Sequence, residues 1–180
     1  MIEALEIGPA DRPRLRSDPT MNVTYLDRRP WKLPNLVVWN IDDLPLPFKD
    51  NEFDLIYAYQ VLEHSTRFPD LMDDLHRILK PSGSLHVEVP HMDWEMRLGP
   101  VPTHYRLFTQ ETFKRYEELD YVKRWHVVSL RTTRLYDMIL ENEGGGKIIE
   151  NPKLRNVIRL LVRAPHLLDK CEIRAVLKPA

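Results

Sequence analysis

The sequence predicts a three-layer α/β domain built on an open, mostly parallel sheet. Three observations lead to this fold class: short apolar runs recur in the first half of the chain, a strong helix pattern separates two of them, and helix and strand patterns mix in the second half. A strand, helix and strand in succession form a crossover unit, which is right-handed in nearly all proteins. The chain has 180 residues, so we expect a single domain, 1–180, with a sizeable core.

Five short apolar runs predict the first five strands of this sheet. Four of them are too continuous for a sheet with one solvated face, which is typical of parallel strands covered on both sides. The runs are residues 4–7, 23–26, 36–39, 53–58 and 85–89, of which the last alternates.

A helix is predicted between the fourth and fifth strands. Acidic residues come early in this stretch, and Pro81 and Gly83 end the pattern. Apolar residues recur at helical spacing and predict one buried face, formed by Leu71, Leu75, Ile78 and Leu79.

The second half of the chain mixes helices and strands. Thr109 is a suitable N-cap for the first of these helices. A later helix carries a basic stripe, of a kind that is usually solvated, formed by Arg155, Arg159 and Arg163. The expected elements are helices over 109–119, 135–147 and 152–165 and strands over 121–130 and 172–177.

Composition excludes several classes of protein. The 26 basic and 27 acidic side chains give a net charge of -1, which argues against a dedicated nucleic-acid binder. The single cysteine, Cys171, excludes an intrachain disulfide and a cysteine-based zinc cluster. No apolar run approaches the ~20 residues that span a bilayer, and the start carries an acid where a signal peptide is basic. We therefore expect a cytoplasmic protein without a transmembrane segment.

Polar groups follow each of the first five predicted strands. The strands run into LEIGPADRPR, TYLDRRPW, NIDDLPLPF, YAYQVLEH and EVPHMDW. In open α/β sheets, ligands bind beyond the carboxyl ends of the strands, near the point where the strand order reverses. We therefore expect these polar groups to meet around one binding site.

Four motifs along residues 3–90 give this pattern a family resemblance. LEIG, LPFKDNEFD, VLEH and RILKPSG occur in this order. Together they make the chain similar to class I S-adenosylmethionine-dependent methyltransferases, in particular a small bacterial type. The resemblance implies a Rossmann-like sheet, here without the leading helices that often cover the site, so an open pocket or a lid from a partner subunit is expected.

The resemblance also implies S-adenosyl-L-methionine as the cofactor and gives roles to matching residues. Glu6 and Gly8 would flank its methionine part, and Asp27 would take both ribose hydroxyls. The other implied cofactor contacts are Asp42 and the Asp43 backbone at the adenine, Ala10 in the first loop, and Tyr59 and Gln60 after the fourth strand. Asp27 has the plainer alternative of a turn residue, and Asp42 and Asp43 that of a solvated acidic loop. Glu6 lies inside an apolar strand, so its expected role is that of a ligand or of a loop brace.

The first loop departs from the family pattern. The family reads G-x-G, whereas this chain reads Gly8-Pro9-Ala10. The Ala10 methyl is expected to crowd the ligand, Pro9 removes an amide donor, and the prolines leave the first helix short or absent. The alternative function is therefore a degenerate member that binds a ligand or partner without catalysis. A nicotinamide-dependent dehydrogenase would need the full glycine fingerprint.

Methyl transfer needs no catalytic triad or metal, because the sulfonium carries its own leaving group. Alignment of the acceptor supplies much of the rate, and a base helps a hydroxyl acceptor. His104 and His64 are the candidate catalytic residues. One of Tyr57 and Tyr59 is expected to face the sulfonium. His91, Asp93 and His104 match no metal signature, so no metal is predicted.

The acceptor is predicted only by resemblance. PTHYRLFTQETF is similar to a segment in methyltransferases associated with glycan genes, so the expected acceptor is a small molecule, a glycan or a lipid-linked glycan. Two alternatives remain open for the helix over 152–165: its apolar face, otherwise part of the core, is a homodimer contact, or its basic stripe contacts an anionic acceptor or a membrane surface.

Overall fold

One seven-stranded sheet organises the chain in this computed structural model, which describes residues 1–93, 95, 101–118, 125–133 and 172–180. The strand order is β3-β2-β1-β4-β5-β7-β6. The first five strands pair in parallel, and β7 runs antiparallel to both of its neighbours. The strands are β1 (Ile2–Ile7), β2 (Met21–Asp27), β3 (Leu36–Val38), β4 (Phe53–Tyr59), β5 (Leu79–Pro90), β6 (Trp125–Thr133) and β7 (Glu172–Pro179). The predicted open, mostly parallel sheet is confirmed.

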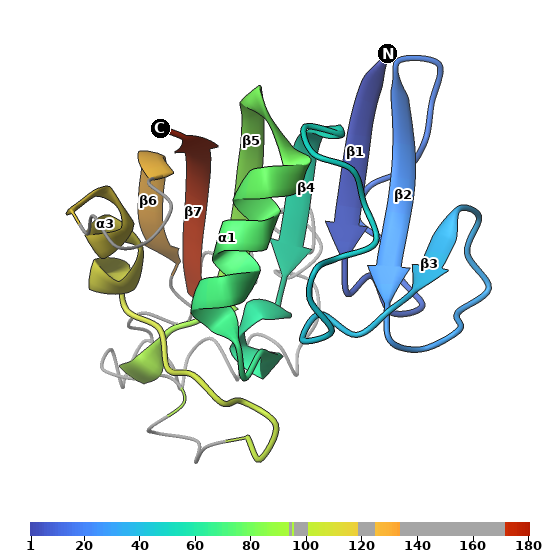
Figure 1. Cartoon of the computed structure of the whole chain (residues 1–180). Helices are drawn as coiled ribbons and strands as arrows, with labels where there is room; N and C mark the ends of the chain where they lie inside the picture. Colours follow the sequence, from blue (N-terminus) through green and yellow to red (C-terminus); the bar gives the residue numbers. More distant parts are fainter. Residues whose placement is uncertain (94, 96–100, 119–124, 134–171) are drawn as a thin grey trace, which may run out of the picture.

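The strand order reverses between β1 and β4. From β1 the chain continues to β2 and β3 on one side, and then returns to β4 and β5 on the other. Figure 1 shows the arrowheads of β1, β2 and β4 pointing to one edge of the sheet, with both chain ends at the opposite edge. The loops that follow these strands therefore gather where ligands bind in open α/β sheets.

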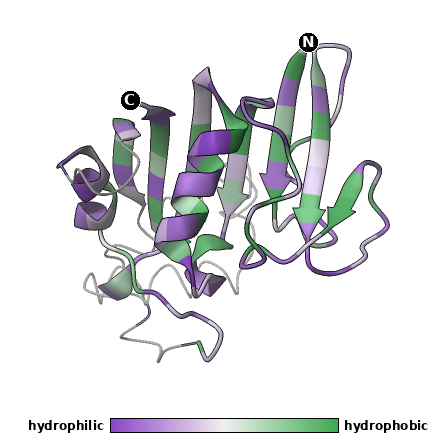
Figure 2. Ribbon diagram, in the orientation of Figure 1, coloured by the Kyte–Doolittle hydropathy of each residue, from purple (hydrophilic) through white to green (hydrophobic). Residues whose placement is uncertain are grey.

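Helix α1 (Phe68–Ile78) is the crossover between β4 and β5. Pro69 stands in its first turn, where a missing N–H costs nothing, and Asp70 complements the positive end of the helix dipole. Its apolar residues lie on one side, which Figure 2 shows in green against a purple outer side. The buried residues are Phe68, Leu71, Met72, Leu75 and Ile78.

The end of this helix differs from the prediction. Leu79 was expected on the buried face of the helix, but it has extended backbone and begins β5, where it pairs with Phe53. The predicted terminators, Pro81 and Gly83, lie inside β5. The helix ends earlier because pairing with β4 satisfies the backbone of this segment, including a register shift between Phe53 and Leu55.

Aromatic side chains fill the core between the sheet and its helices. Phe68 of α1 packs edge-on against Phe108, at 5.2 Å between ring centroids, and against Tyr116 of α3 (Gln110–Glu118) at 6.0 Å. Phe68 is 1% exposed, a burial that contributes about 2–3 kcal/mol. The predicted helix after Thr109 is confirmed, and Thr112 Oγ1 accepts a hydrogen bond from the Thr109 N–H.

The other face of β1 and β2 is covered by the connection 8–20, which contains no helix, as the prolines predicted. Tyr25 on β2 is buried there, and its hydroxyl donates a hydrogen bond to the Leu15 carbonyl oxygen at 2.9 Å. This connection holds its shape through hydrogen bonds from individual side chains rather than through helical turns.

Some predicted features fall outside the described residues. These are the helices over 135–147 and 152–165 with their basic stripe, the start of the strand over 121–130, and Cys171. Within the part of the chain that the structure describes, no helix is long and apolar enough to cross a membrane.

Candidate functional site

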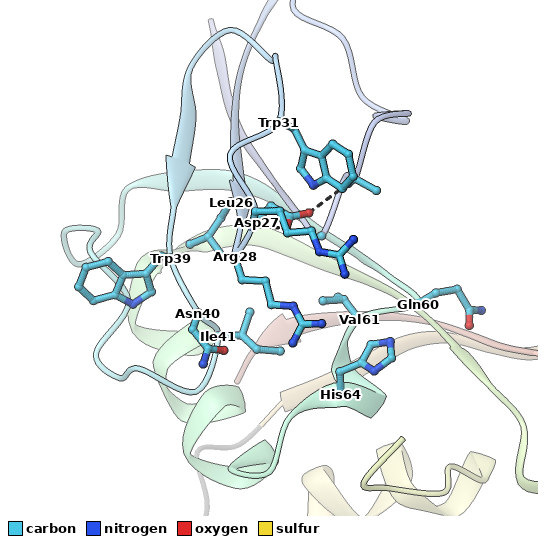
Figure 3. A pocket seen from close by; sticks show the side chains of 13 residues that line it. Leu26, Asp27, Arg28, Trp31, Trp39, Asn40, Ile41, Gln60, Val61 and His64 are labelled. Atoms are coloured by element: carbon cyan, nitrogen blue, oxygen red, sulfur yellow. Dashed lines mark hydrogen bonds between the residues drawn. The ribbon is translucent and has the colours of Figure 1, made fainter. Parts of the chain in front are cut away.

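A cavity of about 250 Å³ lies at the edge of the sheet where β1 to β4 end. We call it the tip cavity (Figure 3). Each of the four loops that follow these strands contributes to its wall. Its lining residues are Gly8, Ala10, Leu26, Asp27, Arg28, Arg29, Trp31, Trp39, Asn40, Ile41, Gln60, Val61 and His64. Of the eight predicted cofactor residues, this cavity brings together Gly8, Ala10, Asp27 and Gln60.

The first loop follows a left-handed path at two of its lining residues. Gly8 has φ 70° and Ala10 has φ 50°. A side chain at Gly8 would meet Val61, since a Cβ there would lie 2.9 Å from Val61 Cγ2. Ala10 therefore retains the backbone conformation for which the family uses a second glycine, and its exposed position accommodates the methyl group.

Asp27 lies at the wall of the tip cavity and connects two of its loops. Its Oδ2 accepts a hydrogen bond from the Ala10 N–H at 3.2 Å, and its Oδ1 accepts one from the Arg29 N–H at 2.9 Å. An ionised carboxylate has about four acceptor positions, so each oxygen retains capacity for a further donor.

Glu6 lies outside the lining of the tip cavity. It is 2% exposed, and its carboxylate accepts hydrogen bonds from the N–H groups of Arg14 and Leu15 at 2.8–3.0 Å. Burial raises the pKa of Glu6, and these hydrogen bonds oppose the rise. Glu6 thus braces the connection between β1 and β2.

Tyr59 is also absent from the cavity lining. The Arg14 guanidinium lies over its ring, with Cζ 3.2 Å from the ring centroid, and the Tyr57 ring stacks beside it at 6.4 Å. The expectation that only one tyrosine would face the site was wrong, because residues two apart on a strand share a face. Arg14 covers this face.

Asp42 and Asp43 do not line the tip cavity either. The Asp42 carboxylate accepts hydrogen bonds from the Ser65 hydroxyl at 2.6 Å and from the N–H and hydroxyl of Thr66. Burial raises the pKa of Asp42, but these hydrogen bonds outweigh it and leave the pKa below its ordinary value. Asp43 is exposed, and its carbonyl oxygen accepts a hydrogen bond from Trp39 Nε1 at 2.6 Å.

His64 and His104, the two predicted catalytic residues, lie side by side, with 4.7 Å between ring centroids. Together with Glu63 and Glu95 they form what we call the carboxylate–histidine cluster. His64 Nδ1 contacts the Thr103 carbonyl oxygen at 2.8 Å, and His104 Nδ1 contacts Glu95 Oε1. Burial raises the pKa of Glu63 to about 8, with a further increase from Glu95, and burial lowers the pKa of His64.

His91 and Asp93 form a separate pair. The Asp93 N–H donates to His91 Nδ1 at 3.0 Å, whereas His104 contacts Glu95. The His91, Asp93 and His104 group considered from the sequence is therefore divided between two sets of contacts.

Sequence reasoning missed most of the cavity wall. Trp31, Trp39 and Ile41 provide flat or apolar surfaces, and Arg28 extends across the opening toward Ile41 and His64 in Figure 3. The Trp31 Nε1–H is buried and has no hydrogen-bond partner among the described residues. The available signal was Trp31, shortly after the predicted strand 23–26, and Trp39, the last residue of the predicted strand 36–39.

A methyltransferase-domain family model matches residues 17–87. The match begins after the first loop and ends before His104. A curated relative, an uncharacterized protein of Methanocaldococcus jannaschii, is 46% identical over 50 residues, which are 28% of this chain. The chain spans 22% of the length of that relative.

Solved structures with the same fold cover nearly the whole chain. One is from the complex between the Haloferax volcanii Trm112 methyltransferase activator and a methyltransferase, with 13% identity, TM-score 0.63 and coverage of 99% of this chain and 82% of that one. Another is an S-adenosylmethionine dependent methyltransferase from Mesorhizobium loti, with 13% identity, TM-score 0.60 and coverage of 98% and 90%. A third is the [4+2]-cyclase SpnF, with 15% identity, TM-score 0.61 and coverage of 99% and 75%.

The predicted resemblance is therefore confirmed: the chain has the fold of class I S-adenosylmethionine-dependent methyltransferases and matches a methyltransferase-domain model over residues 17–87, from β2 into β5. The presence of a cyclase among the neighbours shows that this fold alone does not fix the reaction. The residues of the tip cavity and of the carboxylate–histidine cluster, and not the fold, determine the reaction.

Proposed function

We propose that the protein transfers a methyl group from S-adenosyl-L-methionine, held in the tip cavity, to a hydroxyl group of an acceptor. One observation carries this proposal: the loops after four successive parallel strands line a single cavity at the reversal of the strand order. A cavity at this position, with polar groups converging on apolar walls, is the usual place for a ligand.

The residues of the cavity fit the adenosyl group. Asp27 has free acceptor capacity on both carboxylate oxygens, which suits two adjacent ribose hydroxyls. The Trp31 and Trp39 rings with Ile41 suit a flat, apolar base. Gly8 lies at the wall without a side chain, so its backbone can approach a ligand.

The other predicted cofactor residues act indirectly in this proposal. Glu6 holds the loop that follows β1, and Asp42 holds the loop that follows β4. Tyr59 supports Arg14, and Asp43 fixes the orientation of Trp39. Removing the side chain of Glu6, Asp42 or Tyr59 would disturb the cavity walls rather than remove a ligand contact, whereas the Asp43 contact uses its backbone carbonyl group and does not depend on its side chain.

When bound, S-adenosyl-L-methionine supplies an electrophilic methyl carbon with a good leaving group. The chain then has to align the acceptor and exclude water, and alignment alone can contribute several kcal/mol to lowering the barrier. His64 belongs to both the cavity wall and the carboxylate–histidine cluster. We therefore place the acceptor at this cluster and assign His64 and His104 the activation of its hydroxyl group.

The proposed acceptor is a hydroxyl group of a glycan or of a lipid-linked glycan. His104 belongs to PTHYRLFTQETF, the segment that is similar to glycan-associated methyltransferases. His104→Ala should therefore reduce methyl transfer to such an acceptor while S-adenosylhomocysteine still binds.

Calorimetric titration of S-adenosylhomocysteine into the full chain tests the cofactor site, with NAD titrated in parallel. We expect binding of S-adenosylhomocysteine and none of NAD. Asp27→Ala should weaken binding by about 100-fold or more, because hydrogen bonds to a charged group contribute about 1.5–3 kcal/mol each. Asp43→Ala is the matched control, since Asp43 is an exposed acid outside the cavity lining, and its affinity should be unchanged.

Absence of binding to the native chain would support the degenerate, non-catalytic alternative. Equal losses in Asp27→Ala and Asp43→Ala would show that the tip cavity is not the binding site. Selective NAD binding would overturn both functions.

A further inference from the structure

The carboxylate–histidine cluster contains the side chains of a metal site. One potential ligand atom from each of Glu63, His64 and His104 lies within 4.8 Å of the other two. These residues come from separate parts of the chain, because Glu63 and His64 belong to the 3₁₀ helix η1 (Leu62–His64) after β4 and His104 belongs to the segment after β5. The fold, and not local sequence, therefore creates the cluster.

In both imidazoles, Nδ1 contacts a neighbouring oxygen atom, which leaves Nε2 as the possible metal ligand. A carbonyl oxygen only accepts hydrogen bonds, so the contact between His64 Nδ1 and Thr103 O requires a proton on Nδ1. An ionised Glu95 imposes the same condition on His104 Nδ1. In the neutral ring, the lone pair then lies on Nε2. A carboxylate or carbonyl that holds the other ring nitrogen is the usual second shell of a metal-binding histidine.

The carboxylates of the cluster are buried and incompletely satisfied. Glu63 is 1% exposed and Glu95 is 4% exposed. The Oε2 atom of each carboxylate is inaccessible to solvent and has no hydrogen-bond partner among the residues that the structure describes. Leaving such a group unpaired costs about 1–3 kcal/mol, and more when it is charged. A cation bound beside the Glu63 carboxylate would satisfy its unpaired oxygen atom.

We infer that the carboxylate–histidine cluster is a binding site for a divalent transition metal. The ligands are His64 Nε2, His104 Nε2 and the Glu63 carboxylate. Glu95 and the Thr103 carbonyl group orient the two rings. Two imidazoles and one carboxylate suit Zn²⁺, Mn²⁺ or Fe²⁺ and leave coordination positions open, whereas Mg²⁺ prefers oxygen ligands alone.

The metal site adjoins the tip cavity, because His64 lines that cavity. A metal with open positions there would bind an acceptor hydroxyl and lower its pKa, so that the proton leaves to solvent water while His64 and His104 act as ligands and not as the proton acceptor. This part of the inference rests on the proposed methyl transfer and explains how His64 and His104 activate the acceptor. Metal binding itself does not depend on the cofactor and is tested without it.

Calorimetry with the untagged full chain and Zn²⁺ alone is the first test. We expect one Zn²⁺ per chain and no detectable binding of Mg²⁺ under the same conditions. Mn²⁺ provides a test that needs no variant, because it should broaden the NMR signals of His64 and His104 and leave those of His86, a half-buried histidine on β5, unchanged.

Variants assign the ligands. His104→Ala and Glu63→Gln should each weaken Zn²⁺ binding by 100-fold or more. Glu95→Gln should weaken it by about 10–100-fold, the usual effect of losing a second-shell partner. His86→Ala is the matched control and should retain the native affinity. Circular dichroism verifies that each variant is folded.

Failure to bind Zn²⁺, or equal binding by His104→Ala and the native chain, would overturn the metal site. Broadening by Mn²⁺ at other histidines alone would do the same. These failures differ from failure of the proposed function, because S-adenosylhomocysteine binding at Asp27 is measured in the absence of metal.

Discussion

Two regions of the molecule, both rich in charged motif residues, differ in how their polar atoms are used. The first is the clamp, formed by Arg77 with Asp50, Asp74 and the carbonyl oxygens of Leu46 and Phe48. Its guanidinium contacts Asp74 at 2.6 Å, Asp50 at 2.9 Å and the Phe48 carbonyl at 2.8 Å. The second is the edge with the tip cavity and the carboxylate–histidine cluster, where one buried oxygen atom each of Glu63 and Glu95 has no hydrogen-bond partner among the described residues.

The difference separates structural motifs from functional ones. The motifs LPFKDNEFD and RILKPSG meet in the clamp and in the nearby ion pair of Asp54 with Lys80, at 2.8 Å. Their charges satisfy one another, so they hold α1 and the loop before β4 in place. The motifs LEIG and VLEH lie at the strand tips. There, residues with left-handed backbone and groups with unused hydrogen-bond acceptor capacity line a cavity. Polar groups whose hydrogen-bonding capacity is not fully used by neighbouring residues are therefore the better indicator of function.

Arg77→Ala should show the largest effect and should be confined to stability. The substitution removes several charge-assisted hydrogen bonds of a half-buried guanidinium, so we expect a loss of about 3 kcal/mol in the free energy of unfolding. Urea denaturation measures it, and affinity for S-adenosylhomocysteine should stay unchanged at a temperature where the variant is folded.

Arg67→Ala is the control for the clamp. Arg67 pairs with Asp70 across side chains that are 48% and 59% exposed, so its loss should cost less than about 1 kcal/mol. Similar losses in the two arginine variants would contradict a special role for the clamp.

Gly8→Ala should affect both stability and cofactor binding. The new Cβ would lie 2.9 Å from Val61 Cγ2, at a residue with φ 70°, so we expect about 2 kcal/mol of destabilisation and weaker S-adenosylhomocysteine binding. Combining it with Val61→Ala should recover part of the stability, because the contact is with that side chain. A neutral effect of Gly8→Ala would show that the loop relaxes freely.

Ala10→Gly should have the smallest effect, and in the favourable direction. Ala10 has φ 50°, which glycine adopts without a steric cost, so we expect up to about 1 kcal/mol of stabilisation in thermal unfolding. Ala4→Gly, in buried strand β1, is the control and should destabilise the protein. A loss of stability in Ala10→Gly would mean that the alanine is not strained.

The sequence predicted the elements whose patterns are strong. Continuous apolar runs located β1 to β4, the alternating run 85–89 located β5, and the helical spacing of Leu71, Leu75 and Ile78 located α1. The start of β5 at Leu79 was missed because pairing with Phe53, a residue distant in sequence, overrides the local signal of Pro81. Hydrophobic periodicity does not encode which strand a segment will pair with.

The candidate site was predictable only in part. The tips of parallel strands meet at one edge, and this rule placed Gly8, Asp27 and Gln60 together. The rule does not tell whether a carboxylate will contact the ligand or a backbone amide. The Glu6 carboxylate contacts backbone amides. The meeting of His104 with His64 depends on the path of the segment after β5, which carries no periodic pattern.

Hydrogen–deuterium exchange with and without S-adenosylhomocysteine tests the central claim most directly, because it reports on both regions in one sample. The ligand should slow exchange in residues 8–10, 27–31, 39–41 and 60–64, the four loops of the tip cavity, and leave exchange in 46–54 and 77–83 unchanged. Protection at the clamp, or no protection at the four loops under saturating ligand, would contradict it.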